Sequence, residues 1–486
     1  MKLYNTLTRQ IEEVKPLFDK TIKMYTCGIT VYSHPHIGNW VGYIYWDVLQ
    51  RTLENEGFTV IRTQNYTDVG HLTSDDDSGE DKMEKGAKAD GITAWDVAEK
   101  YITICENESA RLHLKVPTYL IRATSLIKEQ IEFVSGLEEK DFTYIIPGDG
   151  VYFDTSKLTD YGKLAKLDID GLEAGVRVSI EGKRNITDFA LWKFSPTEQK
   201  RDMEWSSPWG VGFPGWHLEC SVIARQTLGD QIDIHCGGID HIPVHHTNEI
   251  AQTESLTGKQ FSQIWVHNNH IKVDGTKMSK SLGNIYTLTD IAQKGYDVMA
   301  FKYMILSKHY TTEGNFTWDN LAKHSQTVLT IRNARDMILQ PKDQPTAVDQ
   351  EYLEAELSKI KDALGDKLNT PEALQLLEHC AKRIKGEGIY SGDTLHATKF
   401  FEQIDGLLGF DFIDNKPDAH RIASLVEEFS TAYNSAKQSK DFSTSDKLRD
   451  QIQSYGYELS ISKDGKITWY ANMRATLSAN STLKVD

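Results

Sequence analysis

Four residues of types that bind soft metal ions are distributed along the chain. His245 and Glu249 lie four residues apart in a segment with helical spacing, so their side chains share one helix face. Cys27 and Cys220 would add two thiolates to this imidazole and carboxylate. Because a set of two cysteines, one histidine and one glutamate suits tetrahedral Zn²⁺, the sequence offers a candidate zinc site.

The spacing leaves other interpretations of these residues open. His241 and His245 are equally four residues apart and Cys236 is close to them, which makes a rival metal set. Without a metal, Cys220 would be a small buried hydrophobic residue and Glu249 a solvated helix charge. Spacing alone does not choose among these three interpretations.

A second cluster is suited to phosphate. The segment HIKVDGTKMSKSLGN, residues 270–284, places Lys277 and Lys280 among small hydroxyl residues on a glycine-flanked loop. Two ammonium groups on a mobile loop can close over the α-phosphate and the leaving pyrophosphate of a triphosphate. The plain alternative is a solvated basic loop. The phosphate interpretation is favoured because the segment HIGN, residues 36–39, is expected at a strand-to-helix turn.

The elements around the first cysteine must position these groups. Residues 21–27 form a β-like run, residues 37–57 have apolar residues at helical spacing up to a closing glycine, and residues 58–66 form a second β-like run. This order predicts a parallel βαβ unit, in which ligands bind at the carboxyl ends of the strands. An anionic ligand would meet the amides of this helix there, in the same place as Cys27, Thr30, His34 and His36.

Composition restricts the class of protein. The 486 residues are 39% hydrophobic and 26% charged, which indicates a multidomain globular protein. The start of the chain has no apolar signal segment and no stretch approaches the ~18 apolar residues of a membrane span, so we expect a cytoplasmic protein with no membrane partner. Five scattered cysteines indicate reduced thiols. The net charge of −16 argues against a general polyanion binder, although a local basic face can still bind RNA.

Changes of pattern along the chain predict an α/β fold with several modules. The predicted parts are a Rossmann-like parallel-sheet domain (1–137 and 201–318), an inserted connective module (138–200), an all-α helical bundle (319–425) and a small C-terminal module (426–486). The last module should contain a hairpin, because ISKDGKITWY, residues 461–470, has an Asp-Gly turn between β-like runs. Trp469 in that hairpin is a candidate RNA contact by position, although such a tryptophan more often packs against its own module. The acidic residues 74–82 are expected to form a solvated loop.

Several motifs occur together in an order that resembles one family. HIGN resembles the HIGH signature of class I aminoacyl-tRNA synthetases, and residues 277–281 match their KMSKS signature. Five further motifs are similar to those of the cysteinyl-tRNA synthetase family: YTCGITVY (25–32), NYTD (65–68), GKRNITDFALWK (182–193), PGWHLECS (214–221) and HHTNEIAQ (245–252). The resemblance covers most of residues 1–310 and returns weakly near residues 441–452.

The resemblance implies an activity and its partners. The family activates L-cysteine with ATP to cysteinyl-adenylate and transfers it to tRNA(Cys), with Mg²⁺ accompanying ATP. The resemblance also implies one Zn²⁺ per chain, which binds the substrate thiolate. Its ligands would be Cys27, Cys220, His245 and Glu249, so the resemblance favours His245 over His241. A monomer with no editing domain is expected, because no region is left over for a second hydrolytic site.

The same resemblance assigns roles to the motif residues. The cysteine pocket would contain Gly28, Thr30, Thr67 and Trp216. ATP would be bound by His36, Gly38, Asn39, Gly238, Asp240 and Lys280. The charge that develops on the phosphate would be stabilised by His36, Lys277 and Lys280.

The chain departs from the family pattern at three places, and two other functions suit a similar core. Ile29 stands in place of proline, and Trp40-Val41-Gly42 stands where the family often has Ala-Arg. The third departure is the inserted GHLTSDDDSGE at residues 70–80. The resemblance implies that residues 1–137 and 201–318 form the catalytic domain, that the bundle of residues 319–425 binds tRNA and that residues 426–486 bind the anticodon. A cysteine ligase acting on an amino sugar, as in mycothiol synthesis, would have no use for an anticodon-reading module. A non-catalytic RNA-binding paralogue predicts eroded motifs, and the motifs are intact here.

Overall fold

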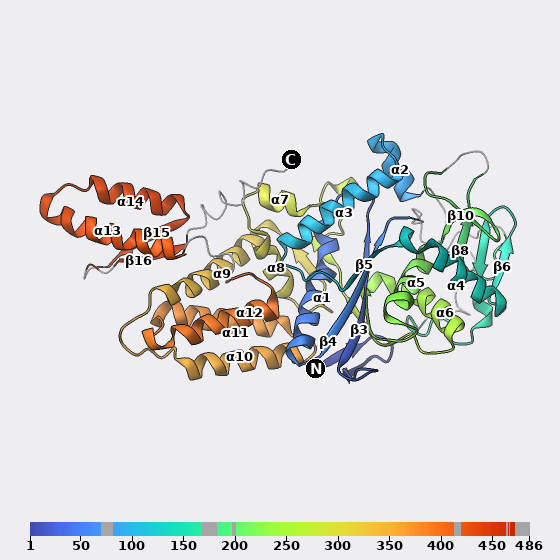
Figure 1. The fold of residues 1–486 in the computed structure, drawn as a ribbon, viewed down its shortest axis with the longest axis horizontal. Coiled ribbons are helices and arrows are strands. Elements are labelled where there is room, and N and C mark those ends of the chain that lie inside the picture. The colour runs from blue at the N-terminus through green and yellow to red at the C-terminus, as the bar shows by residue number, and fades with distance from the viewer. Residues whose placement is uncertain are drawn as a thin grey trace. The chain divides into compact units, whose positions relative to one another are not determined.

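The computed structural model describes residues 1–69, 81–166, 182–196, 201–412, 419–462, 465 and 467–471 (Figure 1). The chain divides into two compact units. The first comprises Met1–Trp46, Leu53–Ala110 and Lys115–His270, and the second comprises Asp47–Thr52, Arg111–Leu114 and Ile271–Asp486. Among the described residues, no helix combines the length and the apolar character needed to cross a membrane.

The centre of the first unit is a five-stranded parallel sheet. Its strands are β3 (Thr21–Thr30), β4 (Thr59–Thr67), β5 (Tyr119–Arg122), β11 (Ile232–Gly238) and β12 (Ser262–Asn268), in the spatial order β12-β11-β3-β4-β5. The chain therefore builds outward from β3 in one direction and from β11 in the other. In open parallel sheets this reversal point is where ligands bind, beyond the carboxyl ends of the strands. The Rossmann-like prediction is confirmed.

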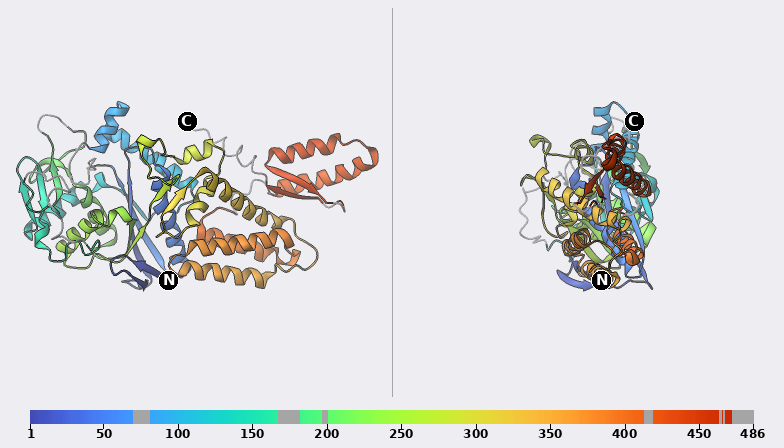
Figure 2. Two further views of the ribbon diagram at one scale, coloured as in Figure 1. Left: turned by 180° about the vertical axis from the view of Figure 1, so that it is seen from behind. Right: turned by 90° about the vertical axis from the view of Figure 1, so that its left-hand side faces the viewer.

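Helices cover the two faces of this sheet. Figures 1 and 2 show α1 (Ile37–Asn55) on one face, with α5 (Trp216–Leu228) and α6 (His245–Thr257) on the other. The predicted order of strand, helix and strand over residues 21–66 is confirmed, although β3 continues three residues further than expected. A register irregularity between Thr26 and Ile29 accompanies this extension. The extension makes residues 28–30 the carboxyl end of β3, where two of the candidate pocket residues lie.

Two helices and a short hairpin complete the parallel-sheet region. After β4 the chain forms α2 (Lys82–Asp90) and α3 (Ala94–Arg111), and the amino terminus forms the hairpin of β1 (Lys2–Asn5) and β2 (Gln10–Glu13). The predicted acidic loop falls largely outside the described residues, which resume at Asp81. Asp81 caps α2 by accepting hydrogen bonds from the N–H groups of Met83 and Glu84, and it pairs with Arg201 at 2.6 Å.

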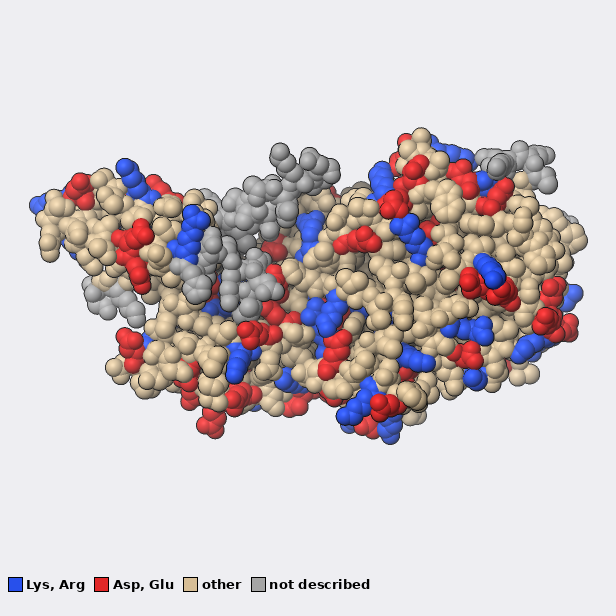
Figure 3. Space-filling view, in the orientation of Figure 1, with Lys and Arg blue, Asp and Glu red and all other residues tan. Residues whose placement is uncertain are grey.

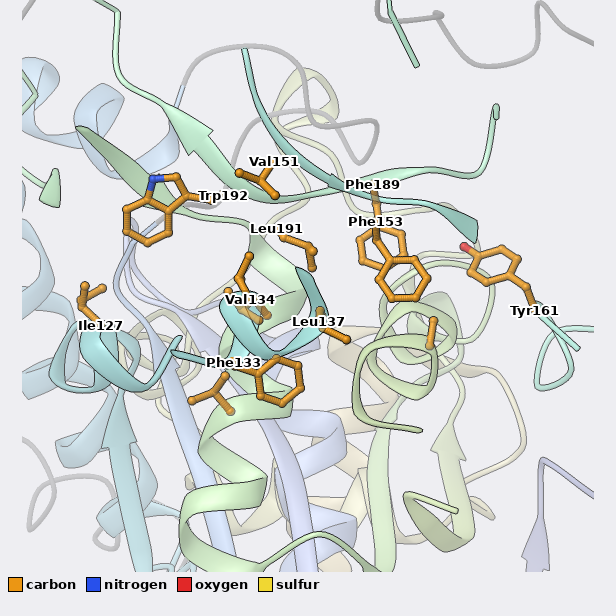
Figure 4. Close-up of a cluster of buried hydrophobic side chains, with 13 residues drawn as sticks. Ile127, Phe133, Val134, Leu137, Val151, Phe153, Tyr161, Phe189, Leu191 and Trp192 are labelled. Carbon is orange, nitrogen blue, oxygen red and sulfur yellow. The ribbon is translucent and has the colours of Figure 1, made fainter. Parts of the chain in front are cut away.

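A second, antiparallel sheet is inserted between β5 and β11. It contains β6 (Thr143–Ile146), β7 (Gly150–Phe153), β8 (Phe189–Phe194), β9 (Trp205–Ser207) and β10 (Gly210–Pro214), in the order β6-β7-β8-β10-β9. Figure 4 shows its core, where Phe153 stacks on Phe189 with ring centroids 5.1 Å apart. Leu137 from α4 (Ile127–Glu139) and Val222 from α5 belong to the same core. The sheet thus rests on α5, the helix that carries Cys220.

The second unit begins with two short parallel strands and continues as helices. Strand β13 (Ile271–Val273) leads into the lysine-rich loop, which contains the short turn η4 (Lys280–Leu282). The chain then forms α7 (Leu288–Gln293), α8 (Val298–Leu306) and β14 (Gly314–Phe316), and β14 pairs with β13. The helical bundle contains α9 (Trp318–Asp336), α10 (Gln350–Gly365), α11 (Thr370–Glu387) and α12 (Thr394–Leu408). The predicted change to helical structure near residue 320 is confirmed.

A buried lysine binds three segments of this second unit together. The Lys302 ammonium of α8 is fully buried and donates to the carbonyls of Leu112 at 3.0 Å and Gly409 at 2.8 Å. Asp47 lies 3.6 Å away and is also paired with Arg51 at 2.8 Å. Burial lowers the pKa of Lys302 to about 8. The ammonium thus donates to two carbonyls in the turns that follow α3 and α12.

The C-terminal module has its own small core. It contains α13 (Ala419–Ser439), α14 (Ser443–Ser454), β15 (Tyr457–Ile461) and β16 (Ile467–Ala471), and the two strands pair antiparallel. The predicted hairpin is therefore confirmed, while residues 463, 464 and 466 of its turn lie outside the described residues. Trp469 is only 4% exposed and packs edge-on against Tyr457. Its position favours a structural role over RNA contact.

The division into four modules, one of them formed by two segments of the chain, stays a prediction. The antiparallel sheet extends to Pro214, beyond the expected boundary at residue 200, because β10 pairs with β8 on one side and β9 on the other. That pairing joins residues on both sides of the predicted boundary in one sheet.

Candidate active site and metal centre

The four predicted metal ligands come together at the reversal point of the parallel sheet. Cys27 lies in β3, Cys220 in α5, and His245 and Glu249 in the first turns of α6. All four are buried, and one ligand atom from each lies within 4.8 Å of the others. The His245 Nε2 atom is 3.1 Å from Glu249 Oε1, and the Cys27 Sγ atom is 3.9 Å from the same oxygen.

A second group of four shares two of these residues. Cys27, His235, His246 and Glu249 also place their ligand atoms within 4.8 Å of one another. The Cys27 Sγ atom lies 3.2 Å from His246 Nε2, and His235 Nε2 lies 2.9 Å from Glu249 Oε2. Sequence reasoning missed both histidines, although His246 stands next to His245 and three residues before Glu249. Neither group contains His241 or Cys236, both of which are described.

The chemistry of the first group fits a divalent, thiophilic cation. Burial raises the pKa of the Cys27 thiol well above its usual value and that of Cys220 to about 11. Two buried thiols of this kind become thiolates near neutral pH only beside a compensating positive charge. Two sulfurs, one imidazole and one carboxylate are a tetrahedral donor set that zinc accepts.

Buried histidines orient the imidazoles around this group. The Nδ1 atom of His245 lies 3.0 Å from Nδ1 of His217, which leaves its Nε2 atom facing Glu249. The Nδ1 atom of His246 lies 2.8 Å from Nε2 of His267. Burial lowers the pKa of both His246 and His267 well below the usual value, so these rings are neutral at pH 7. Such contacts fix the ring orientation and the tautomer of a histidine next to a metal.

Gly28, the first predicted pocket residue, is held by Asn65. The N–H of Gly28 donates to Asn65 Oδ1 at 2.7 Å, and a Cβ atom at position 28 would fall 1.5 Å from the Asn65 carbonyl oxygen. Only glycine fits at so close an approach. The Asn65 Oδ1 atom also accepts a hydrogen bond from the Tyr25 hydroxyl at 3.0 Å. Asn65, which begins the NYTD motif, therefore positions the pocket and was missed from the sequence.

Trp216 contacts the metal group directly, and Thr67 contacts Glu219, the residue before Cys220. Trp216 stacks on the His245 ring with centroids 4.6 Å apart. The Thr67 hydroxyl donates to Glu219 Oε1 at 2.6 Å. Burial raises the pKa of Glu219 well above its usual value, and its Oε2 atom has no hydrogen-bond partner among the described residues. Thr30, the last residue of β3, completes the predicted set at the same sheet edge.

The predicted ATP residues of the first unit lie at the carboxyl ends of β3 and β11. Asn39 caps the start of α1, because its Oδ1 accepts from the His36 N–H at 2.9 Å while its own N–H donates to the His36 carbonyl at 2.9 Å. Burial lowers the pKa of the His36 imidazole, which is therefore neutral at pH 7. Gly38 follows in the first turn of α1. Gly238 ends β11, and Asp240 lies in the short turn after it.

The remaining two predicted residues belong to the second unit. Lys277 is exposed on the loop after β13. Lys280 is the first residue of η4, and its side chain lies outside the described part of the structure. Each unit therefore carries part of the predicted set: the HIGN turn belongs to the first unit and the KMSKS loop to the second.

Comparison with known proteins places this arrangement in a family. A family model for the class I (C) tRNA synthetase catalytic domain matches residues 13–326. Cysteine–tRNA ligase 1 of Burkholderia lata is 40% identical over 468 residues, which cover 96% of each chain. The cysteine–tRNA ligase of Treponema denticola is 37% identical over 496 residues, covering 96% of this chain and 99% of that one.

Solved structures agree on the fold. Methionyl-tRNA synthetase of Mycobacterium tuberculosis, in complex with methionyl-adenylate, superposes with a TM-score of 0.55 at 14% identity, over 85% of this chain and 94% of that one. A putative arginyl-tRNA synthetase of Campylobacter jejuni gives 0.51 at 14% identity, over 82% and 94% of the two chains. The catalytic-domain model matches residues 13–326, and the similarity to cysteine–tRNA ligases extends over 96% of the chain. The chain therefore belongs to the cysteine–tRNA ligase family of class I tRNA synthetases.

Proposed function

We propose that this chain is a cysteine–tRNA ligase, which activates L-cysteine with ATP and transfers the cysteinyl group to tRNA(Cys). The proposal rests on the buried group of Cys27, Cys220, His245 and Glu249. This group lies at the reversal point of the parallel sheet, where open α/β sheets bind their ligands. Membership in the family supports the same activity. The test is cysteine-dependent exchange of pyrophosphate into ATP by the purified chain, followed by charging of tRNA(Cys).

The proposed resident metal is one Zn²⁺ per chain. When bound, it supplies a soft Lewis acid to which the thiolate of the substrate can coordinate. The residues of the chain are proposed to hold the rest of the amino acid. Trp216 stacks on His245, Thr67 donates to Glu219 beside Cys220, and Gly28 lets the backbone of β3 approach Asn65 closely. Thr30 is proposed to complete this pocket.

The activation step needs charge stabilisation and no protein nucleophile. The substrate carboxylate attacks the α-phosphate of Mg²⁺-bound ATP and pyrophosphate leaves. The terminal ribose hydroxyl of the tRNA then attacks the adenylate carbonyl, loses its proton and displaces AMP. We propose that His36, Lys277 and Lys280 stabilise the charge that develops on the phosphate oxygens. Gly38, Asn39, Gly238 and Asp240 are proposed to bind ATP, the last two at the adenosine ribose.

The C-terminal module is suited to single-stranded RNA. Figure 3 shows Lys and Arg interspersed with Asp and Glu on one face of the protein, without an extended field of one sign. In an acidic chain, residues 419–471 nevertheless contain as many Lys and Arg as Asp and Glu, seven of each. Phe442 is 39% exposed with its ring 6.0 Å from Tyr433, and Lys437 lies 4.8 Å from the Tyr433 ring. Aromatic rings beside cations form stacking platforms for unpaired bases.

Phe442→Ala is expected to lower kcat/KM for tRNA charging by about 5- to 100-fold, because a base–aromatic stack contributes roughly 1–3 kcal/mol. Pyrophosphate exchange without tRNA should stay at the wild-type rate. The control is Tyr470→Ala, which removes another exposed aromatic ring of the module, bonded through its hydroxyl to Glu458. Equal losses in both variants, or none in Phe442→Ala, would count against this platform.

Cys220→Ser is expected to leave the protein with less than about a tenth of its zinc, since an alcohol is a poor zinc ligand at neutral pH. Metal content after purification, measured by atomic emission, checks this. Cys380→Ser is the matched control, because Cys380 is equally buried but lies in α11. A Cys220→Ser protein that keeps its zinc, with His246→Ala losing it, would instead assign the metal to the second group of four.

All five cysteines are free thiols in the structure. Because reduced thiols persist in the cytoplasm, we propose that compartment as the place of action. A monomer remains the proposed state.

A further inference from the structure

The KMSKS loop is held in shape by a residue outside the signature itself. The Asn284 side chain accepts a hydrogen bond from the Ser279 N–H at 2.8 Å through Oδ1. Its Nδ2 group donates to the carbonyl of Lys277 and to the hydroxyl of Thr276, both at 3.2 Å. One amide thus contacts three residues across the loop and closes residues 276–284 into a ring.

The side chains of this loop are poorly buried. Between Asp274 and Gly283, every described side chain is exposed or only partly covered, and Leu282 is 63% exposed. No described side chain of the loop is therefore fully buried. Further hydrogen bonds within it involve the Ser279 hydroxyl, which lies 3.2 Å from the Ser281 hydroxyl and accepts from the Leu282 N–H at 3.3 Å. Its entry is set by Thr276, whose N–H and hydroxyl both donate to the Val273 carbonyl at 3.0 Å. From Thr276 onward the backbone depends on hydrogen bonds for its shape.

We propose that Asn284 is a positioning residue that keeps the backbone around Lys277 and Ser279 in one conformation, so that the loop meets the phosphates of ATP with its shape already set. This rests on the proposed function, in which Lys277 and Lys280 bind those phosphates. A loop that must order itself at each encounter loses part of its binding energy to conformational entropy, whereas a closed ring of nine residues has already lost that freedom.

Two variants test the ring in the full chain. Asn284→Ala removes the amide, and Asn284→Leu keeps a similar volume without donors or acceptors. Both should lower kcat for cysteine-dependent pyrophosphate exchange by about 10- to 100-fold. The KM for cysteine and the melting temperature should not change, because the contacts lie on an exposed loop. Wild-type kcat in Asn284→Leu would mean that the hydrogen bonds do not matter, and would overturn the proposal.

The control is Asn315→Ala. Asn315 Oδ1 accepts from the Gly275 N–H at 2.8 Å, so this variant loosens the base of the loop but leaves the ring intact. Its kcat should stay within about twofold of wild type, well short of the roughly 10-fold or greater loss expected from a misplaced catalytic group. A loss as large as that of Asn284→Ala would show that any contact at the loop base has the same effect, which would also overturn the proposal.

Limited digestion separates this proposal from the proposed function. Trypsin cuts after lysine, and an unclosed ring should be cut faster at Lys277 and Lys280 in both Asn284 variants than in the wild type, with or without ATP. If the wild type showed no exchange at all, the proposed function would fail while faster cleavage still supported the ring. Equal cleavage of wild type and both variants would overturn the ring whatever the activity.

Discussion

Serine is expected to be activated at least about 10⁴-fold less efficiently than cysteine, measured as kcat/KM in pyrophosphate exchange. The two amino acids differ by one atom, and a pocket that senses shape alone separates such isosteres by only about 10². The buried group of Cys27, Cys220, His245 and Glu249 changes the basis of the choice. With the proposed zinc held by these residues, a thiol with a pKa near ~8.5 would ionise on the soft cation and a hydroxyl would not, so the difference would be a metal–sulfur bond against none.

L-2-aminobutyrate is the matched probe for this prediction. It has the shape of cysteine with a methyl group in place of the thiol, so it should be rejected about as strongly as serine. Cys220→Ser, depleted of metal, should lose most of the preference for cysteine. A wild-type ratio of only tens for cysteine over serine would contradict selection by the metal and would leave Cys27 without a role in substrate choice.

His36→Ala is expected to lower kcat for pyrophosphate exchange by about 10²- to 10³-fold, the usual loss when one donor to a developing oxyanion is removed. Because burial lowers the pKa of His36, the ring is neutral at pH 7 and donates one N–H. The KM for cysteine should change little, since the ring is not part of the metal group. Single-turnover formation of the adenylate, followed by rapid quench, measures the effect directly.

His34→Ala is the control for His36. His34 lies on the same loop, and its Nε2 atom is 3.8 Å from the buried Glu108 carboxylate. This variant should stay within about threefold of wild type, because it lacks a proposed contact with the phosphate. Comparable losses in both variants would mean that the loop conformation, rather than a donor at His36, limits the reaction.

The sequence by itself determined what depends on neighbouring residues. The strand at β3, the helix α1 after the HIGN turn and the hairpin of the C-terminal module follow from periodicity and turn residues that act over a few positions. The pairing of His245 with Glu249 is equally local, because one helical turn brings them to the same face. Residue type made Cys27 and Cys220 candidate partners, and the family resemblance favoured them over the other interpretations.

Only the tertiary structure decided which distant residues meet. Cys27 and Cys220 approach because the sheet order β12-β11-β3-β4-β5 brings β3 next to β11, with α5 and α6 over the same face. No periodicity encodes that order. The same packing brought His235 and His246 beside Glu249, and the separate core of the C-terminal module buried Trp469. Contacts of this kind depend on which faces bury each other, and that is a property of the whole fold rather than of any segment.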